Sequence, residues 1–423
     1  MIKILKYDET DKEKIFSRAV ASANVEGIVA DVINEVKEKG DDALKAYTLK
    51  FDGVKLESLE VSEEEIDEAV ENADAEFIRI LETAAKNIAF YHEKQKRDGF
   101  TLNKENGVVL GQKVIPLNKV GIYVPGGTAA YPSTVLMNAV PAKIAGVGKI
   151  IMTTPPKKDG KINPDILLAA KIAGVDKIYK IGGAQAVAAL AYGTESVEAV
   201  DKIVGPGNAF VAEAKKQVFG KVAIDMIAGP SEIMVIADGK SNPVFVAADL
   251  LSQAEHDKLA TAVLITDSKK LAEEVAKELY AQVEKLERRD IAFASIENNG
   301  KIIVTDNLES AVELANALAP EHLELCVEDP FALLEKVKNA GSVFLGRYCP
   351  EALGDYYAGP NHTLPTMGTA KFSSPLSVDD FVKKMQFTYY TEEALEEVAS
   401  DIDYFAKKEG LTAHAKSVTV RKK

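Results

Sequence analysis

The stretch 249–257 carries polar groups at the end of an apolar run that begins near Val244. The density of apolar residues predicts a helix packed against a core, with polar side chains on its last turn. Gln253 and His256 lie three residues apart, so on a helix they project from one face. An imidazole beside an amide oxygen could form half of a divalent metal site. The histidine could equally be hydrogen-bonded without any ligand, and the pair alone leaves both interpretations open.

Glu321 and His322 are adjacent ionisable residues directly before Leu323–Val327, which is predicted to be a strand. Two such groups at the mouth of a strand are well placed for proton transfer. Adjacent residues of a regular strand point to opposite faces, so both serve one site only if the chain turns here. The alternative is a solvated Glu and a capping His. Cys326, within the strand pattern, is expected to be buried rather than nucleophilic.

Two later segments carry further carboxylates and imidazoles. Gly354–Pro365 is rich in turn formers and is predicted to be a long site loop holding Asp355 and His362. Glu409 and His414 follow just past the end of a predicted helix.

Three glycine turns follow predicted strands, at Tyr123–Gly127, Ile181–Gln185 and Val204–Asn208. Glycines there let backbone N–H groups and the next helix's N-terminus approach a phosphate, although they also simply form tight turns. The sequence holds no Gly-x-Gly-x-x-Gly fingerprint, so a dinucleotide would be held by a variant arrangement. Because successive turns point toward one sheet edge, they predict a ligand site without naming the ligand.

The elements that must position these residues change in kind near residue 107. Before it, Val25–Lys39 and Ser62–Glu93 read as amphipathic helices, and His92 in its charged context is expected to face solvent. After it, short β-rich runs alternate with helical stretches, which is typical of βαβ units and parallel sheets. The predicted strands are 120–124, 150–153, 177–181, 203–204, 232–237, 262–266, 302–305, 323–327 and 343–345, and the predicted helices include Pro132–Ala145 and Pro164–Ala173.

Composition narrows the class of protein. The 423 residues carry a formal net charge of −14 without a basic patch, so neither nucleic acid nor an anionic membrane is an expected partner. No apolar run reaches the ~20 residues that span a bilayer, and the N-terminus lacks a signal-peptide core. The two cysteines, Cys326 and Cys349, cannot form a disulfide framework. A cytoplasmic location is therefore expected.

Together these motifs resemble the histidinol dehydrogenase family, in family order from roughly residue 30 to 415. The matching stretches begin at Tyr123 (YVPGG), Gly182 (GGAQ), Gly205 (GPGN), Gly229 (GPSE), Ser252 (SQAEH), Ala319 (APEHLE), Gly354 (GDY) and Pro360 (PNHTLPT). The resemblance implies two incomplete Rossmann-like domains with parallel sheets and small, mainly helical terminal segments. We assign residues 1–25 to an N-terminal segment, 26–118 plus 238–376 to a first α/β domain with the metal and catalytic residues, 119–237 to a second with the NAD-binding turns, and 377–423 to a helical appendage exchanged between subunits.

The resemblance also implies the chemistry: two consecutive NAD-dependent oxidations, of L-histidinol to the aldehyde and then to L-histidine. It implies a homodimer with shared sites and one Zn²⁺ per subunit, for which Mn²⁺ or Co²⁺ could substitute. Carried over to this sequence, the implied roles are zinc ligation by Gln253, His256, Asp355 and His414, catalysis by Glu321 and His322, NAD contacts from Tyr123, Gln185 and Asn208, and substrate contacts from Ser231, Gln253, His256, His322, Asp355, Glu409 and His414.

Three other functions compete with this interpretation. The same scaffold could oxidise another small polar alcohol such as a sulfonated diol, although Glu409, His362 and His414 favour histidinol. A zinc hydrolase could use Glu321 to activate water, but would not need glycine turns for a dinucleotide. A non-catalytic metabolite-binding protein would not need the adjacent acid and base.

Overall fold

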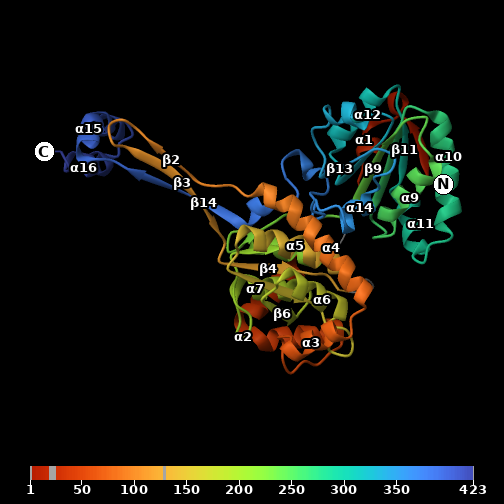
Figure 1. The fold of residues 1–423 in the computed structure, drawn as a ribbon, viewed down its shortest axis with the longest axis horizontal. Helices are drawn as coiled ribbons and strands as arrows, with labels where there is room; N and C mark the ends of the chain where they lie inside the picture. Colours follow the sequence, from red (N-terminus) through yellow and green to blue (C-terminus); the bar gives the residue numbers. More distant parts are fainter. Residues whose placement is uncertain (1, 19–24, 127–129, 423) are drawn as a thin grey trace. The chain divides into compact units, whose positions relative to one another are not determined.

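The computed structural model describes residues 2–18, 25–126 and 130–422 (Figure 1). The chain divides into two compact units. Unit 1 comprises Met1–Gln95 and Leu117–Phe381, and unit 2 comprises Lys96–Pro116 and Val382–Lys423. Among the helices of the described ranges, none combines the length and the apolar character needed to cross a membrane.

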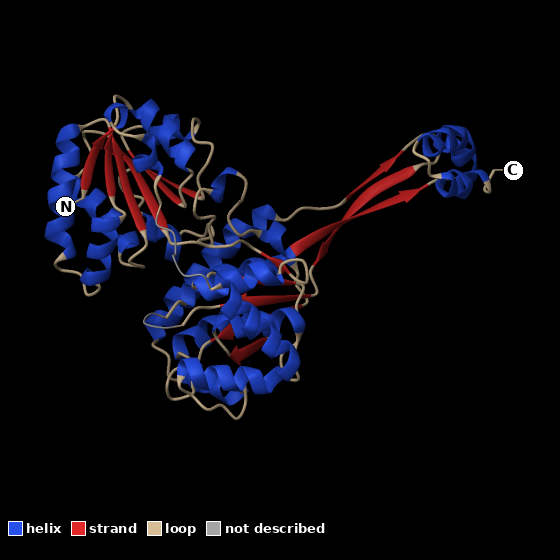
Figure 2. Ribbon diagram, turned by 180° about the vertical axis from the view of Figure 1, so that it is seen from behind, coloured by secondary structure: helices blue, strands red, loops and turns tan. Residues whose placement is uncertain are grey.

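Unit 1 contains two parallel sheets flanked by helices (Figure 2), which confirms the predicted α/β class. The larger sheet has the order β1 (Lys3–Lys6), β11 (Lys301–Val304), β10 (Thr261–Thr266), β9 (Glu232–Ala237), β12 (His322–Cys326) and β13 (Ser342–Leu345). The central strands β9, β10 and β12 are buried along their whole length. Most positions of β9 and β10 are apolar, which reflects this burial, because parallel strands are covered on both faces.

Helices build one apolar core on each face of this sheet. The first core contains side chains of α9 (Pro243–Ala254), α10 (Lys269–Val283) and α11 (Arg289–Asn298). The second contains side chains of α1 (Lys12–Phe16), α12 (Leu308–Leu318) and α13 (Pro330–Leu334). Since α9 returns from the carboxyl end of β9, its last turn lies at the amino edge of the sheet.

The smaller sheet of unit 1 has the order β6 (Lys177–Lys180), β5 (Lys149–Thr154), β4 (Lys119–Tyr123), β7 (Lys202–Val204) and β8 (Ala223–Ile224). In order of appearance along the chain this is 3-2-1-4-5, the order of doubly wound dinucleotide-binding folds. One face packs against α2 (Glu26–Asp52), α7 (Gly183–Tyr192) and α8 (Ala209–Val218). The other packs against α3 (Glu63–Glu71), α4 (Ala75–His92), α5 (Pro132–Ala145) and α6 (Pro164–Ala173).

Local signals set the bounds of several helices. Both α5 and α6 have proline in the first turn, and they end at Gly146 (φ 86°) and Gly174 (φ 74°). Proline is preorganised for a helix start and glycine for a left-handed end, so both predicted ranges are confirmed. A capping box formed by Ser62 and Glu65 starts α3.

The prediction of a solvent-facing His92 is wrong. Its side chain is fully buried, with Nδ1 2.8 Å from the carbonyl oxygen of Ile88 and Nε2 3.4 Å from Asn361 Nδ2. The position follows from helical spacing, because α4 buries Leu81, Ala84 and Ile88, and residue 92 comes one turn later on that face. The charged neighbours in sequence hid this periodicity.

Unit 2 is a three-stranded antiparallel sheet with two helices. The strand order is β14 (Val382–Tyr389), β3 (Val109–Pro116) and β2 (Phe100–Asn103), and α15 (Glu392–Lys408) and α16 (Thr412–Thr419) follow. The expectation of a helical segment from residue 377 is therefore corrected over 382–389. All eight residues of β14 pair with β3, a long-range partner that a local reading of the charged segment does not reveal.

The structure also differs from the expected domain boundaries in three places. Strand β1, expected in a separate N-terminal segment, pairs with β11 of the larger sheet. Helix α2, expected in the catalytic domain, packs in the core of the smaller sheet. Strand β9, expected in the NAD-binding domain, lies at the centre of the larger sheet. In each case the location is set by pairing or packing with residues far away in sequence.

Candidate active site

The acid–base pair lies at the amino end of β12. His322 is the first residue of the strand, Glu321 lies in a bend before it, and both side chains are buried. Glu321 Oε2 accepts a hydrogen bond from the backbone N–H of Glu232 at 2.8 Å, and His322 Nδ1 lies 3.0 Å from the Glu232 carbonyl oxygen. The bend brings Glu321 Oε2 to 3.8 Å from His322 Nδ1. The chain therefore turns at Glu321, as is needed for Glu321 and His322 to serve one site.

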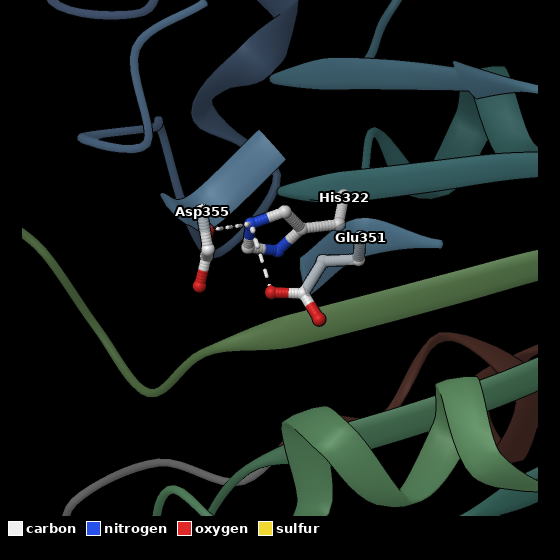
Figure 3. Close-up of side chains that lie close together, drawn as sticks. All are labelled: His322, Glu351 and Asp355. Atoms are coloured by element: carbon white, nitrogen blue, oxygen red, sulfur yellow. Dashed lines mark ion pairs between the residues drawn. The ribbon is translucent and has the colours of Figure 1, made fainter. Parts of the chain in front are cut away.

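The other ring nitrogen of His322 faces two carboxylates (Figure 3). Nε2 lies 3.7 Å from Asp355 Oδ1 and 3.9 Å from Glu351 Oε1. Within the described part of the chain, this buried nitrogen has no hydrogen-bond partner. When Nδ1 donates its proton to the Glu232 carbonyl, Nε2 is the nitrogen free to take up a proton.

Both carboxylates belong to one short helix, α14 (Glu351–Tyr356). The sequence predicted a loop over Gly354–Pro365, so this expectation is corrected for its first three residues. Glu351 was not predicted as a site residue, although its four-residue spacing from Asp355 places both on one helical face. Ser252 Oγ donates to Glu351 Oε2 at 2.8 Å, which connects α14 to the last turn of α9.

Glu232 is a second site residue that the sequence analysis did not predict. The buried Glu232, whose backbone holds Glu321 and His322, pairs through its side chain with Arg18, at 2.6 Å between Nε and Oε1.

The backbone is strained just before Glu321 and His322. Ala319 has a φ of 51°, a left-handed conformation that non-glycine residues rarely adopt. Such strain persists only where the surroundings enforce it, as they commonly do at functional sites.

The environment keeps protons on this cluster. Burial raises the pKa of Glu321 to about 8. Burial opposes the charged form of His322, but the charge of Glu321 and the proximity of Asp355 outweigh it and raise the pKa of His322 to about 10. Burial also raises the pKa of Glu351 to about 7. Burial acts in the same direction on Asp355, yet His322 and His362 hold the pKa of Asp355 well below its usual range. The negative charge therefore concentrates on Asp355.

A cavity of about 120 Å³ opens beside His322 and Asp355. Its lining includes Cys349 and His362. The His362 ring is fixed by two contacts, with Nδ1 3.1 Å from the Asp355 carbonyl oxygen and Nε2 3.3 Å from Thr134 Oγ1. Cys326 is buried as expected, and burial raises the pKa of its thiol to about 11, so the thiolate needed for nucleophilic chemistry is disfavoured.

The residues present fit a divalent cation. Gln253 Oε1 is buried without a hydrogen-bond partner in the described ranges, which leaves an oxygen free for a ligand. Burial lowers the pKa of His256, which favours the neutral imidazole that binds metals. The charge of Asp355 opposes this lowering of the pKa, and the charge of His322 adds to it. In addition, single ligand atoms of His322, Glu351 and Asp355 lie within 4.8 Å of one another. Asp355 is common to this group and to the predicted ligand set.

Three predicted residues remain. Ser231 directly precedes β9, next to Glu232. Glu409 and His414 are exposed residues of unit 2, at the end of α15 and on α16 respectively.

The glycine turns at the carboxyl edge of the smaller sheet carry the three predicted NAD contacts. The Tyr123 hydroxyl accepts a hydrogen bond from Gly183 N at 3.1 Å, and Gln185 is buried in the first turn of α7. Asn208 caps α8 by accepting from the backbone N–H groups of residues 210 and 211. Gly127, in the first predicted turn, lies outside the described residues.

A buried ion pair supports the turn that contains Asn208. Lys215 and Asp225 pair within the core, and Lys215 Nζ donates to the Gly205 carbonyl oxygen at 3.0 Å. Gly205 N donates to Asp225 Oδ2 at 2.8 Å, so both backbone groups of this glycine are held. Gly205 has a φ of 109°, and a Cβ there would lie 2.2 Å from the Tyr123 carbonyl oxygen, which explains why the turn requires glycine.

Comparisons with known proteins agree with these features. A family model described as histidinol dehydrogenase matches residues 17–422. The chain is 57% identical over 426 residues to the histidinol dehydrogenase of Clostridium acetobutylicum, covering 100% of this chain and 99% of that protein. It is 58% identical over 393 residues to that of Geobacillus kaustophilus, covering 93% of each.

Comparison with solved structures agrees with the comparison of sequences. The crystal structure of histidinol dehydrogenase from Elizabethkingia anophelis matches with a TM-score of 0.94 and 40% identity, over 99% of this chain and 98% of that one. An acetylating aldehyde dehydrogenase from Geobacillus thermoglucosidasius, at 15% identity and a TM-score of 0.50, shares the fold alone. The resemblance read from the short motifs is confirmed, and the chain belongs to the histidinol dehydrogenase family of oxidoreductases.

Proposed function

We propose that this chain oxidises L-histidinol to L-histidine through L-histidinaldehyde, at the end of histidine biosynthesis, with NAD as oxidant. Family membership supports the substrate and the double oxidation. The observation that carries the chemistry is the unpartnered His322 Nε2, buried beside Asp355 with Glu321 on the other side of the ring. One site then holds a base for each of the two steps.

His322 serves the alcohol step. The raised pKa of His322 favours the protonated ring, so the base is the neutral fraction, which grows with pH. In this form Nε2 accepts the hydroxyl proton, and the Nδ1 contact with the Glu232 carbonyl holds the ring in place and stabilises the resulting imidazolium. Glu321 serves the aldehyde step in its ionised form, whose fraction grows as pH rises toward the raised pKa of this carboxyl. The carboxylate takes a proton from the water that adds to the aldehyde carbonyl. Neither step needs a cysteine nucleophile, in agreement with the raised pKa of Cys326.

Two bound groups would complete this reaction. NAD would accept a hydride in each oxidation, and Zn²⁺, for which Mn²⁺ or Co²⁺ could substitute, would orient the imidazole and amine of the substrate. We assign Gln253, His256, Asp355 and His414 to the metal, and Tyr123, Gln185 and Asn208 to NAD. The substrate contacts are assigned to Ser231, Gln253, His256, His322, Asp355, Glu409 and His414.

We further propose a cytoplasmic homodimer in which each site takes Glu409 and His414 from the second copy of the chain. The assignment rests on the family resemblance. Unit 2 supports it, because its buried helical side chains are only Ala394, Ala399, Ala406 and Ala415 among the described residues. Large apolar side chains such as Tyr404 and Phe405 are exposed there, and exposed apolar patches commonly mark protein interfaces.

Counting NADH tests the reaction. Because one site performs both oxidations, about two NADH are expected per L-histidinol, with little free aldehyde released. The measurement is NADH absorbance at exhaustion of a known amount of substrate, with the product separated by chromatography. One NADH per substrate with accumulation of aldehyde would contradict the double oxidation. A faster reaction with a sulfonated diol would contradict the substrate.

Replacing Gln253 by leucine tests the metal site. The change removes a buried oxygen that has no protein partner, so metal-free protein should unfold at a temperature similar to that of the wild type. The bound zinc, measured by atomic absorption after dialysis, should fall well below one per subunit. The matched control is Gln217→Leu, since this glutamine lies on α8, which packs against the smaller sheet, and its replacement should leave zinc content unchanged. Full zinc occupancy in the Gln253 variant would remove this residue from the ligand set.

A further inference from the structure

Asp52, the last residue of α2, carries a charge that the fold does not compensate. A helix dipole favours cations at the carboxyl end, so a carboxylate there is unfavourable. Oδ2 is buried and has no hydrogen-bond partner within the described ranges. Burial also raises the pKa of this carboxyl to about 6. Each feature costs folding free energy, which indicates a role other than stabilising the fold.

The carboxylate lies beside the amino end of α7. Asp41, earlier in α2, accepts hydrogen bonds from Thr194 and Ser196, just beyond the carboxyl end of α7. The helix then runs back along α7, at about 1.5 Å per residue, and reaches the level of Gly183 at Asp52. An independent observation agrees: burial raises the pKa of Tyr123 to about 12, the charge of Asp52 contributes, and the Tyr123 hydroxyl contacts Gly183 N.

The acid that usually binds ribose is absent from the smaller sheet. Doubly wound dinucleotide-binding folds place an Asp or Glu about 20 residues after the first glycine turn, where it contacts the ribose 2′-hydroxyl. Here the first acidic residue after Gly126 is Asp159, which accepts a hydrogen bond from Lys161 N in an exposed turn. Strand β5 ends instead in Thr153 and Thr154, whose buried hydroxyl oxygens have no partner in the described chain.

The end of β5 lies in close contact with the turn before α7. Pro155 follows Thr154, and a Cβ built on Gly182 would lie 2.7 Å from the Cβ of Pro155. Asp52 therefore approaches from α2 the place where the usual acid would stand. Its charge repels phosphate from this turn. At the Gly205–Asn208 turn the carboxylate of Asp225 is paired with Lys215, and the first turn of α8 carries no acidic residue, so that turn remains suited to a diphosphate.

We propose that Asp52 binds the hydroxyl groups of the adenosine ribose and so selects NAD over NADP. This inference rests on the proposed use of NAD. A carboxylate accepts hydrogen bonds from a ribose diol but repels a 2′-phosphate, so one side chain provides both attraction and exclusion.

The test compares NAD and NADP binding to full-length wild type and Asp52→Asn by isothermal titration calorimetry. Loss of charge-assisted hydrogen bonds should weaken NAD binding about 10- to 100-fold. The ratio of NAD to NADP affinity should fall at least ~10-fold, because the repulsion of the 2′-phosphate disappears as well. Asp52→Asn should unfold at a temperature equal to or above that of metal- and cofactor-free wild type, since an uncompensated charge has been removed.

Asp41→Asn is the matched control on the same helix. It removes a carboxylate that is hydrogen-bonded, so it should lower the unfolding temperature and leave the affinity ratio unchanged. An unchanged ratio in Asp52→Asn, or equal weakening of both cofactors, would overturn the inference while leaving the use of NAD intact. Wild type that binds NADP as tightly as NAD would overturn it too. Failure of wild type to bind NAD would contradict the proposed function itself.

Discussion

Replacing Glu321 by glutamine is expected to slow the oxidation of supplied L-histidinaldehyde by about 10²- to 10⁴-fold, the usual value of a positioned proton transfer. The alcohol step should be affected much less. Glutamine keeps an oxygen that can accept the hydrogen bond from Glu232 N, so the bend before β12 should persist, but it cannot take a proton from water. The measurement is the rate of NADH formation in each half-reaction, with unfolding temperature as a check on folding.

Two further variants help to interpret the effect of Glu321→Gln. His322→Asn should slow both half-reactions, because the unpartnered Nε2 is the base for the alcohol and its ring supports Glu321. Glu328→Gln is the matched control, since this exposed carboxylate lies just past the opposite end of β12 and pairs with Lys240. It should leave both rates unchanged. Small and equal effects of Glu321→Gln on the two steps would remove Glu321 from the mechanism.

Mixed dimers of inactive His256→Ala and His414→Ala chains are expected to regain activity. If each site combines unit 1 of one copy with unit 2 of the other, one site of the mixed dimer contains both substitutions and the other contains neither. Activity should therefore rise from near zero to as much as one working site per mixed dimer. The measurement is NADH formation after the two variants are unfolded and refolded together.

Each variant refolded alone provides the baseline, and two different affinity tags allow the mixed dimer to be isolated. Wild type refolded in the same way sets the maximum recovery. If every chain completed its own site, each site would carry one substitution and the isolated mixed dimer would stay inactive. That result would contradict the shared site while leaving the roles of Glu321 and His322 untouched.

The features that could be predicted from the sequence are those that depend on local interactions. Proline and glycine set the ends of α5 and α6, because they act through their own backbone dihedral angles. Continuous apolar runs gave the parallel strands, since these are buried on both faces. The adjacent acid and base, Glu321 and His322, and the glycine turns were also visible, because each chemical signal is short and contiguous.

The other groups at the site come from distant parts of the chain and could be found only from its three-dimensional packing. Glu351 lies at the site because α14 packs where β12 begins. Glu232 lies there because β9 is the neighbour of β12 in the sheet. Strand β14 required its partner β3, more than 260 positions earlier in the chain. Asp52 reaches the turn before α7 only because α2 packs along α7. In each case the deciding contact is between residues far apart in sequence, and the local pattern of either residue carries no information about its partner.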